Sequence, residues 1–453
     1  MLIYNILYSS SFSRQSTFMD ILSIINKKKQ KRELTEQEID FFVYEYTINK
    51  TIKDYQASSL LTAMNINGLS NNETYYLTKS FINYSSKFEF DKNNEVLIDK
   101  HSSGGIGDKV SIIIIPILLA LGYKIAKISG RGLGFTGGTI DKLDSIKTKT
   151  NFSFNKANKI FKKIGSILMQ QTDDLVPSDK LIYALRDVTA NVDSPGLIVS
   201  SILSKKFVVN SDYIFIDLKV GSGALANDLK KANELAKRMI NVANLMNRKI
   251  CITLTNMNEP LGHFVGNFLE IKESINFLLN INVSNDLKEI IYEFVIKILL
   301  LTKKAKNQSE AIKKIDSVIN NKIAYELFLK WLKEQKASLK QLKKYQQIKS
   351  KYILNVNSNK TGYLEFISAS EIGLISLELG AGRKTKNSKI DFWAGIEILK
   401  KNNNLVKKGG TIAKLYSSKP IDEKLIMRYL NNLKFNKKAK NYKSIIINSL
   451  TNM

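Results

Sequence analysis

Residues 96–121 read VLIDKHSSGGIGDKVSIIIIPILLAL, and this stretch predicts an α/β fold. Val96 to Asp99 has the short apolar run of a buried strand, and Gly104 to Gly107 forms a glycine loop. A helix is expected from Val110 to Leu121, and it is apolar from Ile112 onward. The apolar segment contains Pro116 and is far shorter than the ~20 residues that a membrane-spanning helix needs. The segment therefore predicts a strand, a glycine loop and a buried core helix.

The alternation of strand and helix continues along the chain. Further strands are predicted at residues 123–128, 213–219 and 249–254, and an amphipathic helix at residues 229–246. Strands that alternate with helices pair in parallel, because each helix carries the chain back across the sheet. We therefore expect a mainly parallel sheet.

The first quarter of the chain has the pattern of short amphipathic helices. Thr35 and Glu38 form a capping box, and Ser70 and Glu73 form another, each ahead of apolar residues at helical spacing. Asp54 is expected to cap a helix between them. The region predicts a separate all-helical domain.

The expected fold class is a two-lobed α/β (α+β) protein, with a small all-α domain and a larger α/β domain. Helices at about residues 179–190 and 195–206 interrupt the strand alternation and are expected to return to the helical domain. The expected division is an N-terminal extension at residues 1–18, a helical domain at 19–84 and 178–208, and an α/β domain at 95–172 and 213–453 with a β-containing region from about residue 350. The cleft between the domains is the expected ligand site.

Composition limits the classes of protein to consider. The chain has 453 residues, 44% of them hydrophobic, and carries 69 Lys and Arg against 41 Asp and Glu, a net charge of +28. The lysines are scattered among many Asn, Ile and Tyr, and no nucleic-acid-binding motif accompanies them, so charge alone supports a nucleic-acid-binding alternative. The single cysteine, Cys251, fits a reducing compartment, and no signal-peptide pattern is present, so a cytoplasmic location is expected and no membrane role.

Two glycine-rich loops carry the densest chemistry. Residues 99–109 read DKHSSGGIGDK and residues 129–139 read SGRGLGFTGGT, and each loop follows a predicted strand. Backbone N–H groups, hydroxyls and an ammonium at the start of a helix can bind an anion, and phosphate fits this set. The competing interpretation is a tight turn whose glycines serve geometry alone. Two such loops at neighbouring strand ends favour one anion site.

At these residues the chain resembles the thymidine and pyrimidine-nucleoside phosphorylases. The matching blocks keep the family's order and spacing from about Met19 to the C-terminus: DKHSSGGIGDK at 99–109, SGRGLGFTGGTIDKLDSI at 129–146, YALRDVTANVDS at 183–194, DLKVGSGA at 217–224, MNEPLGHFVGN at 257–267 and LGAGRKTK at 379–386. The resemblance implies a pentosyltransferase that splits thymidine, deoxyuridine or uridine into the base and (deoxy)ribose 1-phosphate. It also implies a homodimer through the helical domain, with phosphate as co-substrate and no organic cofactor.

The resemblance also implies roles for individual residues. The phosphate-binding set is Lys100, Ser102, Ser111, Lys127, Ser129 and Thr139. The base-binding set is Arg186, Ser201 and Lys205, of which the last two are four residues apart and share a helical face. His101 is expected to give a proton or a hydrogen bond to the 2-carbonyl of the base, so that His101, Arg186 and Lys205 form the catalytic set.

Three departures from the family pattern bear on these expectations. Phe135 stands where many relatives have His, and Leu225 stands at a position that is often Phe, so the fit of the base is open. Bacterial relatives hold a monovalent cation, and the matching positions for a K⁺ site are Gly107, Lys109, Leu261, Phe264 and Glu273. A hydroxyl residue is usual where this chain has Lys109, whose ammonium is expected to weaken the ion's site or to replace its charge.

Two enzyme alternatives stay open at this point. A strictly thymidine-specific phosphorylase competes with a broader enzyme, although Ala126-Lys127 ahead of the second loop resembles the broader bacterial type. An anthranilate phosphoribosyltransferase-like enzyme of related fold would need a magnesium-pyrophosphate site, which Arg186, Ser201 and Lys205 do not supply.

Overall fold

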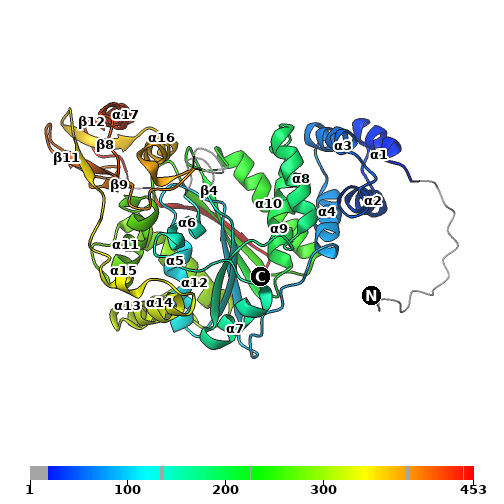
Figure 1. Ribbon diagram of the computed structural model, residues 1–453, viewed down its shortest axis with the longest axis horizontal. Coiled ribbons are helices and arrows are strands. Elements are labelled where there is room, and N and C mark those ends of the chain that lie inside the picture. Colours follow the sequence, from blue (N-terminus) through cyan, green and yellow to red (C-terminus); the bar gives the residue numbers. More distant parts are fainter. Residues whose placement is uncertain (1–18, 133–136, 225, 384–387, 442) are drawn as a thin grey trace. The chain divides into compact units, whose positions relative to one another are not determined.

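The structure is a computed structural model that describes residues 19–132, 137–224, 226–383, 388–441 and 443–453. Within these ranges the chain divides into two compact units, residues 19–84 with 177–201 and residues 85–176 with 202–453. Figure 1 shows the helices and strands of both, coloured along the sequence.

The smaller unit, called the helical unit here, contains only helices among its described elements. They are α1 (Ile21–Lys29), α2 (Glu36–Thr47), α3 (Asp54–Asn67), α4 (Asn71–Asn83), α8 (Pro177–Val188) and the first part of α9 (Pro195–Phe207). Both predicted capping boxes are present, at Thr35 with Glu38 and at Ser70 with Glu73. Asp54 is not the cap of α3, because Lys53 holds that position and the Asp54 carboxylate accepts a hydrogen bond from the Tyr46 hydroxyl.

A buried ion pair lies within the helical unit. Lys28 on α1 donates to both carboxylate oxygens of Glu73 on α4, at 2.6 and 2.8 Å, and both side chains are almost wholly buried. The same carboxylate accepts from the backbone N–H of Leu34 at 2.9 Å. The pair therefore ties α1, the turn after it and α4 together.

The larger unit is built on a mainly parallel sheet, which confirms the predicted fold class. Its strands lie in the order β13-β5-β4-β1-β2-β3. The strands are β1 (Leu97–Ser102), β2 (Lys124–Ser129), β3 (Ser166–Gln170), β4 (Tyr213–Val220), β5 (Ile250–Asn256) and β13 (Ile446–Thr451). β13 pairs antiparallel with β5, and the other neighbours pair in parallel. The chain runs outward from β1 to β2 and β3 and then resumes beside β1 with β4, so the strand order reverses at β1.

Helices pack around this sheet, and helices and strands together form the hydrophobic core of the larger unit. They are α5 (Val110–Ala120), α6 (Thr139–Asp144), α7 (Phe154–Ile164), α10 (Leu229–Leu245), α11 (Asn267–Leu278), α12 (Asn285–Leu301), α13 (Gln308–Asn320), α14 (Ile323–Glu334) and α15 (Leu339–Lys343). Every residue of α5 from Val110 to Leu118 is buried, including Pro116, because α12, α13 and α14 pack around it. The apolar run at α5 is therefore a core helix, as predicted, and no helix within the described ranges is long and apolar enough to cross a membrane.

The C-terminal part of the larger unit adds two antiparallel sheets, which lie together at the left of Figure 1. One has the order β10-β8-β12 and the other β6-β9-β11-β7. Their strands are β6 (Phe264–Val265), β7 (Tyr352–Asn357), β8 (Gly362–Phe366), β9 (Gly395–Ile398), β10 (Leu405–Val406), β11 (Thr411–Ser417) and β12 (Leu433–Asn436), beside α16 (Ala369–Ser376), the π-helix η1 (Leu377–Ala381) and α17 (Lys424–Asn431). β6 precedes α11, which packs with the helices of the parallel sheet, and it pairs with β9 of the C-terminal part. The turn before β6 therefore lies where the parallel-sheet part and the C-terminal part of the larger unit meet.

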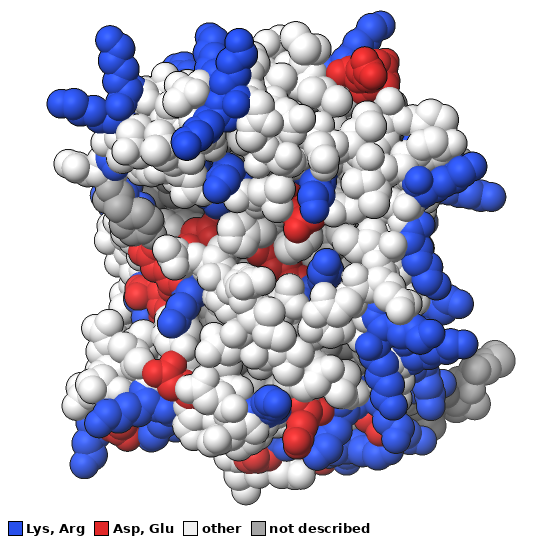
Figure 2. All heavy atoms as spheres, turned by 90° about the vertical axis from the view of Figure 1, so that its left-hand side faces the viewer, with Lys and Arg blue, Asp and Glu red and all other residues white. Residues whose placement is uncertain are grey.

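The charged side chains are dispersed over the face of the molecule drawn in Figure 2. In Figure 2, lysine and arginine side chains project mostly from the rim of the face, acidic side chains lie among them, and uncharged residues fill much of the middle. This distribution is what a uniformly lysine-rich composition produces, and it does not form a continuous basic groove on that face.

Candidate active site

One cavity of about 380 Å³ lies at the carboxyl ends of β1 and β2, beside the point where the strand order reverses. This is the usual ligand position in open parallel sheets. The predicted site residues that line it are His101, Ser102, Ser111, Lys127, Ser129, Thr139 and Lys205. Ser102 and Ser129 are the last residues of β1 and β2, so adjacent strand ends aim both glycine loops at the same space.

The glycines allow these loops to approach each other. Gly104 has φ +87°, a conformation that other residues adopt at a cost. A Cβ on Gly138 would lie 2.0 Å from the backbone nitrogen of Gly132, so no side chain fits between the two ends of the second loop. The glycines are therefore needed for the shape of the loops, and the shape brings polar groups to the cavity.

Hydroxyl groups in the cavity wall are oriented by neighbouring polar groups. The Ser102 hydroxyl donates to a carboxylate oxygen of Asp108 at 2.5 Å and accepts from the backbone N–H of Gly104 at 3.3 Å. Burial alone would raise the pKa of Asp108, but Lys219, Lys100 and Lys142 lower it well below its usual range. Asp108 is therefore ionised at neutral pH and fixes the rotamer of Ser102.

Four cationic side chains line the cavity: Lys127, Lys205, Lys206 and Arg131, of which Arg131 pairs with Asp141 and Asp144. Lys127 is 3% exposed, and its ammonium donates to the backbone carbonyl of Lys100 at 2.6 Å. Burial and repulsion from Lys206 lower the pKa of Lys127 to about 7, although Asp99 partly offsets them. A bound anion would relieve this repulsion, so the cavity favours an anionic ligand.

His101 also lines the cavity, and its imidazole lies in the same positive field. Burial lowers the pKa of His101 well below its usual range, and Lys206, Lys127, Lys100 and Lys205 lower it further. The imidazole is therefore neutral at neutral pH in this structure, a state in which one ring nitrogen donates a hydrogen bond and the other accepts one.

Lys100 differs from the sequence expectation in its position. It is not among the residues that line the cavity; its ammonium lies 3.3 Å from Asp217 Oδ2 and 5.2 Å from the centre of the Phe294 ring. The physical reason is the buried carboxylate of Asp217 on the neighbouring strand β4, with which the Lys100 ammonium pairs. Lys100 acts on the cavity through its charge, as its effect on the pKa values of His101 and Asp108 shows.

The proposed base-binding residues Arg186 and Ser201 belong to the helical unit, whereas Lys205 belongs to the larger unit. Arg186 is 2% exposed and donates to the backbone carbonyls of Asn191, Val192 and Leu197 at 2.9 to 3.3 Å. The Ser201 hydroxyl donates to Asp179 at 3.0 Å. Arg186 thus holds the turn between α8 and α9, with three of its five N–H donors.

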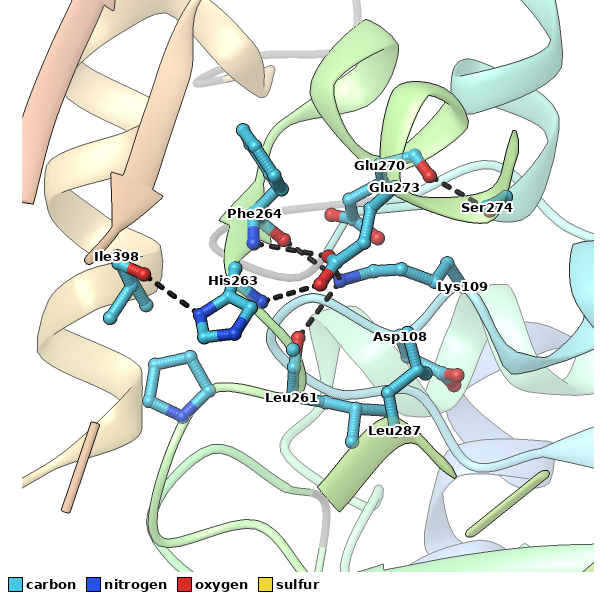
Figure 3. A network of polar contacts seen from close by, with 12 residues as sticks. Asp108, Lys109, Leu261, His263, Phe264, Glu270, Glu273, Ser274, Leu287 and Ile398 are labelled. Atoms are coloured by element: carbon cyan, nitrogen blue, oxygen red, sulfur yellow. Dashed lines mark hydrogen bonds and ion pairs between the residues drawn. The ribbon is translucent and has the colours of Figure 1, made fainter. Parts of the chain in front are cut away.

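The positions predicted for a K⁺ site come together in the larger unit (Figure 3). The Lys109 ammonium lies 2.9 Å from the carbonyl oxygens of Leu261 and Phe264 and 2.5 Å from Glu273 Oε2, and Gly107 lies against the same carbonyls. The residues present do not fit a metal ion, because the ammonium already occupies the point where these oxygens converge. Within the described ranges, no cluster of three or more His, Cys, Asp or Glu side chains is arranged to hold a metal.

Several site residues are not evident from the sequence. Asp108 and Lys206 line the cavity, and Lys206 pairs with the buried Asp99 at 3.0 Å. Arg383 donates to Asp141 at 2.7 Å, and Asp141 accepts from the backbone N–H of Gly132 at 2.7 Å, so a residue far along the chain fixes the second loop. The position of Asp108 directly after the first loop could have indicated its place in the cavity. The Arg383 contact spans 242 positions and has no such local indication.

Phe135 and Leu225, the two departures near the base, lie outside the described residues.

Comparisons with known proteins agree with this geometry. Residues 94–325 match the model of the α/β domain of a glycosyl transferase family, residues 22–85 match the helical bundle domain of such a family, and residues 363–436 match the pyrimidine nucleoside phosphorylase C-terminal domain. The solved structure of anthranilate phosphoribosyltransferase from Thermus thermophilus is similar in fold alone, with a TM-score of 0.56 and 12% identity over 69% of this chain and 99% of that one.

Curated relatives are similar over nearly their whole length. The thymidine phosphorylase of Mycoplasmoides pirum is 46% identical over 410 residues, which cover 90% of this chain and 98% of the relative. The pyrimidine-nucleoside phosphorylase of Bacillus subtilis is 37% identical over 429 residues, which cover 93% of this chain and 98% of the relative. The resemblance seen in the two glycine loops is thus confirmed over 90% or more of the chain, and the chain belongs to the thymidine and pyrimidine-nucleoside phosphorylase family of glycosyltransferases.

Proposed function

We propose that this chain catalyses the reversible phosphorolysis of pyrimidine nucleosides to the free base and (deoxy)ribose 1-phosphate. The observation that carries the proposal is the cavity at the ends of β1 and β2, where hydroxyls from two glycine loops face lysines and a neutral histidine. The domain models and relatives of the chain support the same activity.

Inorganic phosphate is the proposed occupant of the loop end of the cavity. Ser111, Ser129 and Thr139 supply hydroxyl donors and Lys127 supplies an ammonium. The single O–H of Ser102 becomes a further donor to the anion when it turns away from Asp108. Hydrogen bonds between charged partners are shorter and stronger than neutral ones, so this set favours a dianion over a neutral ligand. The pKa of about 7 for Lys127 supports this assignment, because a dianion would stabilise the charged form of that lysine.

In the proposed reaction, a phosphate oxygen attacks C1′ of the sugar from the face opposite the base. The new C1′–O bond forms as the C1′–N1 bond breaks, through a transition state with oxocarbenium character, and the enzyme forms no covalent bond with the sugar. The base leaves with the electron pair of the broken bond and takes up a proton. Donors that bond more strongly to the departing base than to the bound nucleoside accelerate this step.

The donors proposed for the base are Arg186, Ser201, Lys205 and His101. Lys205 and His101 line the cavity. Because the pKa of His101 is depressed, its contribution is a hydrogen bond from the neutral ring to the 2-carbonyl rather than a proton from an imidazolium. Arg186 and Ser201 are assigned to the base from the family resemblance and remain a prediction.

The proposed substrate range includes uridine and deoxyuridine as well as thymidine. Ala126 and Lys127 precede the second loop, which is typical of the broader enzymes, and relatives of both names match the chain. The test is to measure phosphorolysis of the three nucleosides side by side. Turnover of all three supports the proposal; turnover of thymidine alone would restrict the enzyme to that substrate, and release of no base would remove the proposed activity.

We further propose that the enzyme is a homodimer that forms through the helical unit and that it works in the cytoplasm. The support is the family resemblance for the dimer and, for the location, a single buried cysteine, Cys251. Sedimentation of the full chain, with and without substitutions on exposed residues of α1 and α3 such as Leu22 and Ile66, tests the dimer.

A further inference from the structure

The cluster around Lys109 holds a buried positive charge that the proposed reaction does not use. Lys109 precedes α5, and its side chain is fully buried. Its ammonium reaches the turn at residues 261–264 and Glu273 on α11, as Figure 3 shows. The cluster therefore joins three segments: the end of the first glycine loop, the turn before β6, and α11.

The hydrogen bonds of this ammonium are complete. A lysine ammonium has three N–H donors and no acceptor. The three acceptors are the carbonyl oxygens of Leu261 and Phe264, each at 2.9 Å, and Glu273 Oε2 at 2.5 Å. One positive charge thus meets one carboxylate and two carbonyl dipoles.

Glu273 is fixed from its other side by the same turn. Its Oε1 accepts from the backbone N–H of His263 at 2.6 Å, and its Oε2 accepts from that of Phe264 at 3.1 Å. Gly262 makes room for the carboxylate, since a Cβ there would lie 2.6 and 2.7 Å from its two oxygens. Glu273 alone can therefore shape the turn.

One backbone hydrogen bond already joins the turn to the glycine loop, from the N–H of Leu261 to the carbonyl of Ile106 at 3.0 Å. The role left for a cation is to hold together the oxygens that converge beside this contact. At Gly107, a Cβ would lie 2.5 Å from the Leu261 carbonyl oxygen, so the loop and the turn are in close contact there. Converging carbonyl and carboxylate oxygens repel one another unless a positive charge lies among them. In this chain the Lys109 ammonium supplies that charge.

We infer that Lys109 is a covalently attached substitute for a monovalent metal ion, and that it makes the first glycine loop of this enzyme independent of K⁺ and Na⁺. A second cation cannot enter, because the ammonium fills the position and repels it. Lys109 is a positioning residue: it touches no group of the cavity, but it follows Asp108, which orients Ser102.

The first test uses the unaltered full chain. Its thermal midpoint and its turnover are measured in KCl, NaCl and tetramethylammonium chloride at equal ionic strength, and we expect the same values in all three. A higher Tm or turnover specific to K⁺ would overturn the inference, whatever substrate the enzyme uses. The Tm readout stays valid even if the proposed activity fails.

The second test removes the Lys109 ammonium by substitution and asks whether a K⁺ ion can bind in the position that it occupied. In tetramethylammonium chloride, Lys109→Thr should lower the Tm by roughly 5 °C or more, because Glu273 is left buried without its partner. Added K⁺ should restore the Tm with saturation, and Rb⁺ should give an anomalous peak beside Glu273 in crystals of the variant but not of the unaltered chain. Lys109→Met fills the space with an apolar side chain and should not respond to K⁺.

A matched control separates this effect from the loss of any buried lysine. Lys28→Thr removes an equally buried ion pair, with Glu73, from the helical unit. It should lower the Tm without a K⁺-specific recovery. If K⁺ restores Lys28→Thr as well as Lys109→Thr, or restores neither, the assignment of Lys109 to the place of an ion is contradicted.

Discussion

Two buried lysines, Lys127 and Lys142, differ in what neutralises them. The Lys127 ammonium lies in the cavity wall and donates to a neutral carbonyl, and its pKa falls to about 7. The Lys142 ammonium is equally buried but lies 3.0 Å from Glu270 Oε2 and donates to the carbonyl of Asp108 at 2.7 Å and of Gly137 at 3.2 Å. Both ammonium groups are thus buried, but only that of Lys142 has a carboxylate beside it to neutralise its charge.

The difference separates cations that bind a ligand from cations that hold the fold. Lys142 joins the two glycine loops, since Asp108 ends the first and Gly137 belongs to the second. Lys127 lies in a cluster of like charges that an anion would neutralise. A buried lysine with a depressed pKa beside a cavity is therefore the better marker of the substrate site.

The largest expected effect is on stability. Lys142→Met should lower the free energy of unfolding by about 3–5 kcal/mol, because Glu270 is left as an uncompensated buried charge. Lys127→Met should leave stability unchanged or raise it, since it removes a repelled charge. Urea unfolding measures both, with the exposed Lys237→Met as control. Equal losses for Lys142 and Lys127 would erase the distinction between the two lysines.

The next effect concerns the base. Lys205→Ala should reduce kcat and kcat/KM for the nucleoside by about 2–4 kcal/mol of transition-state stabilisation, the scale expected for one placed donor. Arg186→Ala should do the same and should also destabilise the helical unit, because the carbonyls of residues 191, 192 and 197 lose their donor. Steady-state kinetics beside the Lys237→Ala control measures this. Full turnover in both variants would remove α8 and α9 from the catalytic site.

A smaller effect is expected at the loop hydroxyls. Ser102→Ala and Ser129→Ala should each raise the KM for phosphate by about 10- to 100-fold, corresponding to ~1.5–3 kcal/mol for a hydrogen bond to a charged group, with little change in the KM for the nucleoside. Initial rates at varied phosphate and fixed nucleoside measure the change. An unchanged phosphate dependence would place these hydroxyls outside the phosphate site.

The smallest expected effect is the uptake of less than one proton by Lys127 when an anion binds. Above pH 7 most of the Lys127 side chains are neutral in the free enzyme, because the folded pKa is about 7. An anion that raises this pKa must therefore draw a proton from solution, and stability from this group rises with pH between about 7 and the unfolded pKa near 10.4. Titration calorimetry with sulfate at pH 8.5, in buffers of different ionisation enthalpy, should show proton uptake that Lys127→Met abolishes. Binding without uptake would separate Lys127 from the anion.

Local sequence patterns predicted the elements that form the cavity because their signals are local. The strands before both glycine loops, the buried α5 and the capping boxes follow from short-range periodicity and capping. Side-chain alternation on β1 did not exclude Lys100 from the cavity, because Lys100 shares a face of the strand with Ser102, which lines the cavity. The partner that draws Lys100 away, Asp217, is 117 positions distant in the sequence.

Long-range partners were not predictable from such patterns. The antiparallel strand β13, at Ile446–Thr451, pairs with β5, and Asp141 accepts a hydrogen bond from Arg383, 242 positions later in the sequence. Neither contact leaves a local trace, because an isolated Asp or a short apolar run has many possible partners. The pairing of Lys109 with Glu273, 164 positions apart, leaves no local pattern either, and only the family resemblance placed the two residues in one site.

Transfer of phosphate to the sugar is the step that distinguishes phosphorolysis from hydrolysis. Thymidine is incubated with the full chain and ³²P-labelled inorganic phosphate, and released thymine and labelled sugar phosphate are counted together. We expect one labelled deoxyribose 1-phosphate for each thymine and no release of thymine without phosphate. Thymine released without phosphate, or with no label in the sugar, would contradict it.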